Sequence, residues 1–127
     1  MIPAHINEAI SQHVASALIN AKRAKSCVGN FTTDSDIRQL RAETGMALYA
    51  LNGLHDIGVA ETLYLAQSES AGEYAELQNI IDKYRFFVNE IINNVAEFHS
   101  HQWSLIHFNE LCDAVKGTRF RMDGLDD

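Results

Sequence analysis

The chain of 127 residues contains one proline, Pro3, and seven glycines. This composition excludes a collagenous chain, a proline-rich linker and a low-complexity disordered chain. No apolar run approaches the roughly 18 residues that a membrane-spanning helix needs, and no basic start leads into an apolar signal segment. We therefore expect one cytoplasmic globular domain that has no membrane partner.

Cysteine is scarce as well, with Cys27 and Cys112 far apart and no C-x-x-C spacing. Free thiols in a reducing compartment are the expected state, and neither cysteine has the local pattern of a nucleophile. The sequence also lacks a glycine-rich phosphate loop, a nucleophile elbow, an H-E-x-x-H pair and zinc-ribbon spacing. No strong catalytic constellation stands out, and we expect no cofactor.

Basic residues are missing from the middle of the chain. The whole chain has 10 Lys and Arg against 17 Asp and Glu, and residues 42–82 hold seven acidic residues and no Lys or Arg. This segment would repel a phosphate backbone, because nucleic-acid affinity comes mainly from basic side chains. The segment is either a solvated face of the fold or a surface that docks on a protein partner with a basic surface. The predicted partner-binding residues are Glu61, Glu69, Glu73 and Glu76.

Apolar residues recur at helical spacing along most of the chain, and glycines supply the stop signals between the periodic segments. We predict an all-α bundle of four or five helices in a single domain, residues 1–117. Residues 118–127 are expected to form a polar, flexible tail. The predicted helices span about 3–28, 34–57, 59–67, 71–99 and 103–116.

The orientation of the 34–57 helix follows from its largest apolar stripe. Residues along this stripe recur at spacings of three and four, and Met46, Ala50 and Leu54 widen it, so we predict that the helix is largely buried. Gly45 and Gly53 inside the helix either permit close helix packing or mark a kink. The stripe consists of Ile37, Leu40, Thr44, Ala47, Leu48, Leu51 and His55.

The 71–99 helix gives the strongest signal, four heptads in which every core position is apolar or aromatic. Its length of about 44 Å exceeds what a globule of this size easily covers. Either the helix is the central element of the bundle, or part of it pairs with a second chain in a homodimer. The core positions are Tyr74, Leu77, Ile81, Tyr84, Val88, Ile91, Val95 and Phe98.

The string Leu54-His55-Asp56-Ile57-Gly58 resembles the signature of the HD family of metal-dependent phosphohydrolases, which are all-α. The resemblance implies that His55 and Asp56 form the central metal-binding pair. His13 would be the earlier ligand and Asp113 the later one. Imidazole and carboxylate groups hold a divalent cation there, and the cation activates water against a phosphoester.

A second group of imidazoles and carboxylates lies in residues 97–113. Its members are spaced so that pairs share a helix face, which fits hydrogen bonding at the surface or between helices, with metal binding as an alternative. Trp103, the only tryptophan, is either a core residue or an exposed anchor for a partner. The group consists of Glu97, His99, His101, His107, Glu110 and Asp113.

These patterns favour a small acidic interaction protein that binds and modulates another macromolecule without catalysis of its own. Inhibitors, immunity proteins and adaptors encoded by bacteria or their phages are of this type. The HD-type hydrolase is one alternative. A helix-turn-helix regulator is the second, with Gly58 at the turn and residues 59–66 as a recognition helix without Lys or Arg.

Overall fold

The computed structural model describes residues 2–30, 36–67, 75–97 and 101–126. Within them the chain forms four α-helices and one short 3₁₀ helix, and no strand. This confirms the predicted all-α bundle. The elements are α1 (Ala4–Ser26), η1 (Cys27–Asn30), α2 (Asp36–Leu65), α3 (Ala75–Glu97) and α4 (Gln102–Val115).

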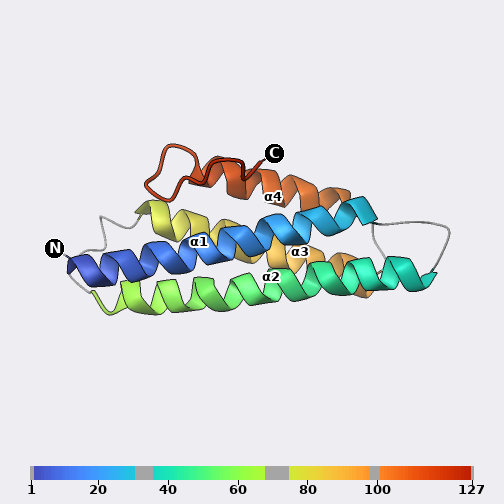
Figure 1. Ribbon diagram of the computed structural model, residues 1–127, viewed down its shortest axis with the longest axis horizontal. Coiled ribbons are helices and arrows are strands. Elements are labelled where there is room, and N and C mark those ends of the chain that lie inside the picture. Colours follow the sequence, from blue (N-terminus) through green and yellow to red (C-terminus); the bar gives the residue numbers. More distant parts are fainter. Residues whose placement is uncertain (1, 31–35, 68–74, 98–100, 127) are drawn as a thin grey trace.

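The four helices lie along one common direction, and consecutive helices run in opposite directions (Figure 1). The most extensive pairings are α1 with α2 and α3 with α4, and α3 also packs on α2. In the described segments, no helix has both the length and the apolar character needed to cross a membrane.

Helix α1 buries the face that its sequence predicts. Pro3 precedes the helix, and its carbonyl accepts hydrogen bonds from the backbone N–H groups of Ile6 and Asn7. Arg23 and Lys25 lie in the last turn, where the helix dipole favours cations. The buried residues include several alanines, which allow a neighbouring helix to approach closely: Ile10, Val14, Ala17, Leu18, Ala21 and Ala24.

Helix α2 corrects the prediction of two helices separated at Gly58. It runs without interruption from Asp36 to Leu65. Among the described glycines only Gly117 and Gly124 have the positive φ that ends a helix. A helical glycine costs up to about 1 kcal/mol relative to alanine, which a helix packed on two neighbours tolerates. The separate turn and recognition helix of a helix-turn-helix are therefore absent from this segment.

The orientation of α2 is also opposite to the prediction. Ile37, Leu40 and Leu48, expected in the core, are 66%, 61% and 57% exposed. The face that packs inward consists mostly of smaller residues. Helix α2 has two apolar faces, and the inward one is the face whose side chains let α1 approach closely. The buried residues of α2 are Ala42, Met46, Ala50, Gly53, Ile57 and Ala60.

Three helices meet at Gly53. The buried Tyr84 of α3 lies over this glycine, and its hydroxyl donates a hydrogen bond to the Ala50 carbonyl at 3.1 Å. Burial first, and the charge of Asp56 second, raise the pKa of Tyr84, so the hydroxyl remains a donor. A Cβ on Gly53 would lie 2.6 Å from Tyr84 Cζ and 3.1 Å from the Ala17 carbonyl oxygen of α1. Only glycine fits this contact.

Helix α3 places its predicted heptad face in the core. Leu77, Ile81, Tyr84, Val88 and Ile91 are buried, while Tyr74 and Phe98 lie outside the described residues. The central position predicted for this helix is not confirmed. The longest described helix is instead α2, with 30 residues against 23 for α3.

The end of the chain packs on the bundle, whereas the sequence predicts a separate polar tail. Phe120 and Leu125 are 7% and 3% exposed and belong to the core. Lys22 of α1 donates a hydrogen bond to the carbonyl of Gly124. The prediction gave weight to the polar residues of this segment and overlooked its few apolar residues, which supply the attachment.

The contact at Gly53 predicts different effects for two glycine-to-alanine substitutions in α2. Gly53→Ala forces a methyl group into Tyr84 and should lower the free energy of unfolding by about 1–3 kcal/mol. Gly45→Ala is the matched control, because its Cβ would lie 3.5 Å from Cys27 Sγ, an ordinary contact. It should raise stability by up to about 1 kcal/mol through helix propensity. Urea unfolding measures both, and equal stabilities would contradict the close approach.

Candidate functional site

A polar cluster joins α1 and α2 beside the Gly53 contact. Asp56 Oδ1 lies 2.9 Å from His13 Nδ1, and Asp56 Oδ2 accepts a hydrogen bond from the Ser16 hydroxyl at 2.7 Å. The Asp56 side chain is 17% exposed and that of His13 is 38% exposed. Both carboxylate oxygens are therefore satisfied within the chain, which is what a half-buried carboxylate between two helices needs.

The geometry of this cluster does not assemble a nucleophile. The Ser16 hydroxyl donates to the carboxylate, whereas an activated serine donates to an imidazole that acts as its base. Because a carboxylate can only accept, the His13 ring donates to Asp56 through Nδ1. The cluster orients one imidazole and ties two helices together.

The structure brings together two of the four residues implied by the HD resemblance, His13 and Asp56. His55 is exposed on α2, and the Asp113 side chain is 78% exposed on α4. A metal site needs several ligands converging on one point. Among the described residues, no group of three or more His, Cys, Asp or Glu side chains is placed to hold a metal ion.

The two neighbours His55 and Asp56 should respond differently to truncation. Asp56→Ala leaves the His13 ring and the Ser16 hydroxyl without their partner and should lower the free energy of unfolding by about 1–3 kcal/mol. His55→Ala removes an exposed side chain and should change it by less than about 0.5 kcal/mol. Thermal unfolding of both variants is the measurement. A larger loss for His55→Ala would show that His55, and not Asp56, is the structural member of the pair.

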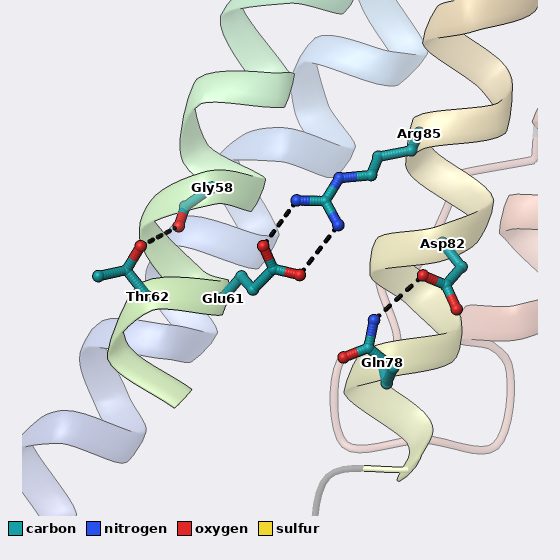
Figure 2. A network of polar contacts seen from close by, with 6 residues as sticks. All are labelled: Gly58, Glu61, Thr62, Gln78, Asp82 and Arg85. Atoms are coloured by element: carbon teal, nitrogen blue, oxygen red, sulfur yellow. Dashed lines mark hydrogen bonds and ion pairs between the residues drawn. The ribbon is translucent and has the colours of Figure 1, made fainter. Parts of the chain in front are cut away.

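The predicted acidic partner-binding residues lie in different settings. The Glu61 carboxylate of α2 accepts two hydrogen bonds from Arg85 of α3, at 2.6 and 2.9 Å (Figure 2). Glu61 therefore links α2 to α3, and both oxygens of its carboxylate are already hydrogen-bonded to Arg85. Glu76 is exposed in the first turn of α3. Glu69 and Glu73 lie outside the described residues.

The Glu61–Arg85 pair makes stability depend on acid pH. The hydrogen bonds from Arg85 lower the pKa of Glu61 below its usual 4.5, although partial burial acts in the opposite direction. A carboxyl whose folded pKa is lowered contributes stability above the unfolded pKa and loses it as the pH falls through the folded pKa. The contribution is below about 1 kcal/mol, since the pair is partly exposed to solvent.

We therefore expect Arg85→Gln to be less stable than the unmodified protein at neutral pH by an amount below about 1 kcal/mol. The difference should shrink as the pH falls below 4.5, the usual Glu value. Urea unfolding of both proteins at several pH values between neutral and acidic tests this. A difference that grows on acidification would contradict the assigned pair.

The second predicted group separates into a buried network and a surface pair. His101 is buried, with Nδ1 3.3 Å from the Ser104 hydroxyl and Nε2 3.3 Å from Glu43 of α2. Asn94 donates to the same Ser104 hydroxyl at 2.9 Å. This network joins α2, α3 and the start of α4, as predicted for hydrogen bonding between helices. Glu97 is exposed at the end of α3, and His99 lies outside the described residues.

The other members lie on the outer surface where α3 and α4 run side by side. His107 of α4 lies 3.7 Å from Glu90 of α3 and 3.4 Å from Glu110, and its ring stacks on Phe86. Lys83 of α3 lies 3.7 Å from the Glu110 carboxylate. Trp103 is 58% exposed on α4, which excludes the sequence alternative of a core residue.

We call this surface between α3 and α4 the α3–α4 face. It combines exposed aromatic and aliphatic side chains with carboxylates and one imidazole. Its aromatic members lie apart in the sequence, and only the pairing of α3 with α4 shows that they share a surface. The face consists of Phe86, Glu90, Trp103, Ile106, His107 and Glu110.

Neither cysteine has the properties of a reactive thiol. Cys112 lines a cavity of about 330 Å³ between the end of α4 and the C-terminal segment. Burial raises the pKa of Cys112 to about 11, and burial also raises the pKa of Cys27. Both therefore remain protonated at neutral pH, whereas thiolate is the nucleophilic form.

Comparison of the chain with protein-family models, with curated proteins and with solved structures finds no match.

Proposed function

We propose that this protein is a small acidic interaction protein that binds and modulates a protein partner through the α3–α4 face, without catalysis of its own. The observation that carries the proposal is the exposure of Trp103, which is 58% exposed and lies one turn of α4 before His107, the partner of Glu90 and Glu110.

The aromatic side chains supply the anchoring part of such a surface. Trp103 and Phe86 are 58% and 54% exposed, and Ile106 beside them on α4 is 38% exposed. Large aromatic rings that stay in contact with water do not contribute the favourable free energy of burial to the fold. Tryptophan is among the residues that most often dominate binding energy at protein interfaces. A partner that covers these side chains recovers that energy.

The charged side chains favour a basic partner. Glu90 and Glu110 lie on the face with His107 between them, and Lys83 neutralises part of this charge. The net charge of the whole chain is −7, which adds a long-range field of the same sign. Such a field speeds association with a basic surface and disfavours nucleic acid.

The polar cluster at Asp56 favours a structural role over a catalytic one. Its carboxylate is occupied by His13 and Ser16, both in α1, and its serine donates away from the imidazole. A general base or metal ligand must instead reach a substrate or an ion. For the HD-type alternative, the chain brings together only two of the four residues that the metal site would need.

Site-specific photo-crosslinking in an extract of the cells that natively produce the protein tests the docking face. A photo-reactive residue in place of Ile106 should capture a discrete partner. The same residue in place of Ile19, which is 43% exposed on α1, is the matched control and should not. Capture at position 106 should fall at least about tenfold with Trp103→Ala, the loss typical of an interface anchor.

Charge variants decide which acidic residues matter. Glu110→Lys should weaken capture and make it less sensitive to salt, while Glu8→Lys on α1 should leave it unchanged. Glu76→Lys should also leave it unchanged. If only Glu76→Lys abolished capture, the docking surface would lie at the start of α3. Capture that neither Trp103→Ala nor Glu110→Lys weakens would contradict the proposal.

A further inference from the structure

Helix α2 carries a continuous exposed seam opposite its buried face. Its large apolar members are Ile37, Leu40, Leu48, Leu51 and Leu65, which are between 44% and 66% exposed. The positions between them are filled by Thr44, His55, Gly58 and Thr62. Successive positions are three or four residues apart over the whole helix, the pattern by which one helix packs against another. These nine positions are called the α2 seam below.

From this seam we infer that two copies of the chain associate through α2, with the two helices antiparallel and Leu51 at the twofold axis. This dimer is independent of the proposed docking function, because the α3–α4 face is formed by other helices. Helices α2 and α4 lie at opposite edges of the bundle in Figure 1.

Charge selects a second copy as the occupant. None of the nine seam positions holds Asp, Glu, Lys or Arg, although the chain as a whole has a net charge of −7. A different partner would be recognised by complementary charges, and this seam offers none. Two seams placed face to face bring no like charges into contact, and antiparallel helices also align their dipoles favourably.

The order of side chains along the seam is self-complementary in the antiparallel sense. Leu51 is midway between the first and last members, Ile37 and Leu65. With Leu51 against its own copy, Ile37 lies opposite Leu65, and Leu40 lies opposite Thr62. Large residues thus face each other at the two ends and at the centre. Between them Leu48 lies opposite His55, and the small residues Thr44 and Gly58 lie opposite each other.

The space beside Gly58 supports the same alignment. A Cβ at Gly58 would meet nothing within 4 Å, and Gly58 lines a hollow of about 420 Å³ together with Leu54, His55 and Val59. Packing within the chain therefore does not explain this helical glycine, which costs stability relative to alanine. In the antiparallel pair, Leu48 of the second copy lies opposite this hollow and fills it as a knob in a hole.

The size of the seam indicates a weak dimer that forms at high concentration. A helix of 30 residues is about 45 Å long, and a strip about 10 Å wide along it covers roughly 450 Å². Two copies together bury on the order of 900 Å², close to the lower limit of about 1,000 Å² for specific interfaces. The heptad face of α3, the other surface on which the sequence predicts a dimer, is already buried inside the bundle.

Sedimentation velocity over a range of concentrations tests association. The unmodified chain should sediment at twice its 14.2 kDa mass at high concentration. Leu51→Glu should remain monomeric there, because the substitution places two carboxylates at the twofold axis. Ile19→Glu on α1 is the matched control and should dimerise normally, since Ile19 and Leu51 are 43% and 44% exposed. Circular dichroism verifies that both variants keep their helicity.

Cysteine crosslinking tests the direction of the pairing. In a Cys27→Ser background, Leu51→Cys should form an intermolecular disulfide on oxidation, because the two positions meet at the axis. Leu40→Cys should not, because it faces Thr62 of the second copy. Crosslinking of both variants would overturn the antiparallel alignment. A monomer at all concentrations, or a dimer that survives Leu51→Glu, would overturn the proposal.

Discussion

The contact between Tyr84 and Gly53 sets the spacing of three helices. The tyrosine ring lies where a side chain on α2 would otherwise be, and its hydroxyl donates to the Ala50 carbonyl one turn earlier. The Ala17 carbonyl of α1 approaches the same point from the other side. Helices at this distance can face each other only with small side chains, which Ala17, Ala21, Ala50 and Ala60 provide.

This spacing determines which surfaces remain exposed. Because the inward face of α2 is restricted mostly to small residues, several large apolar side chains are left on the outside: Ile37, Leu40, Leu48, Leu51 and Leu65. Two polar pairs link neighbouring helices. The contact of Asp56 with His13 joins α1 to α2, and the contact of Glu61 with Arg85 joins α2 to α3. Two surfaces are left for partners, the neutral α2 seam and the aromatic, acidic α3–α4 face. They differ in chemistry and therefore suit different partners.

The sequence predicts the fold class and much of the core, since α1 and α3 each have one dominant apolar stripe and bury it. The prediction is wrong for α2, which has two apolar stripes. The stripe with the larger side chains indicates a buried face that is in fact exposed. Periodicity measures hydrophobicity but not the space that a neighbouring helix leaves, so the small-residue face could be recognised only with α1 and Tyr84 in place. The sequence offers Trp103 either as a core residue or as an exposed anchor. That Trp103 shares a surface with Phe86 follows only from the pairing of α3 with α4.

The central claim is that α2 turns the face that contains Met46, Ala50 and Ile57 inward and the α2 seam outward. Methyl NMR with a soluble paramagnetic agent measures this directly, using the Leu51→Glu variant so that the seam is not covered by a second copy. We expect strong broadening of the methyl signals of Leu40, Leu48 and Leu65, and protection of Met46 and Ile57. Protected leucines with broadened Met46 and Ile57 would mean that α2 is rotated by half a turn, and the account of both surfaces would fail.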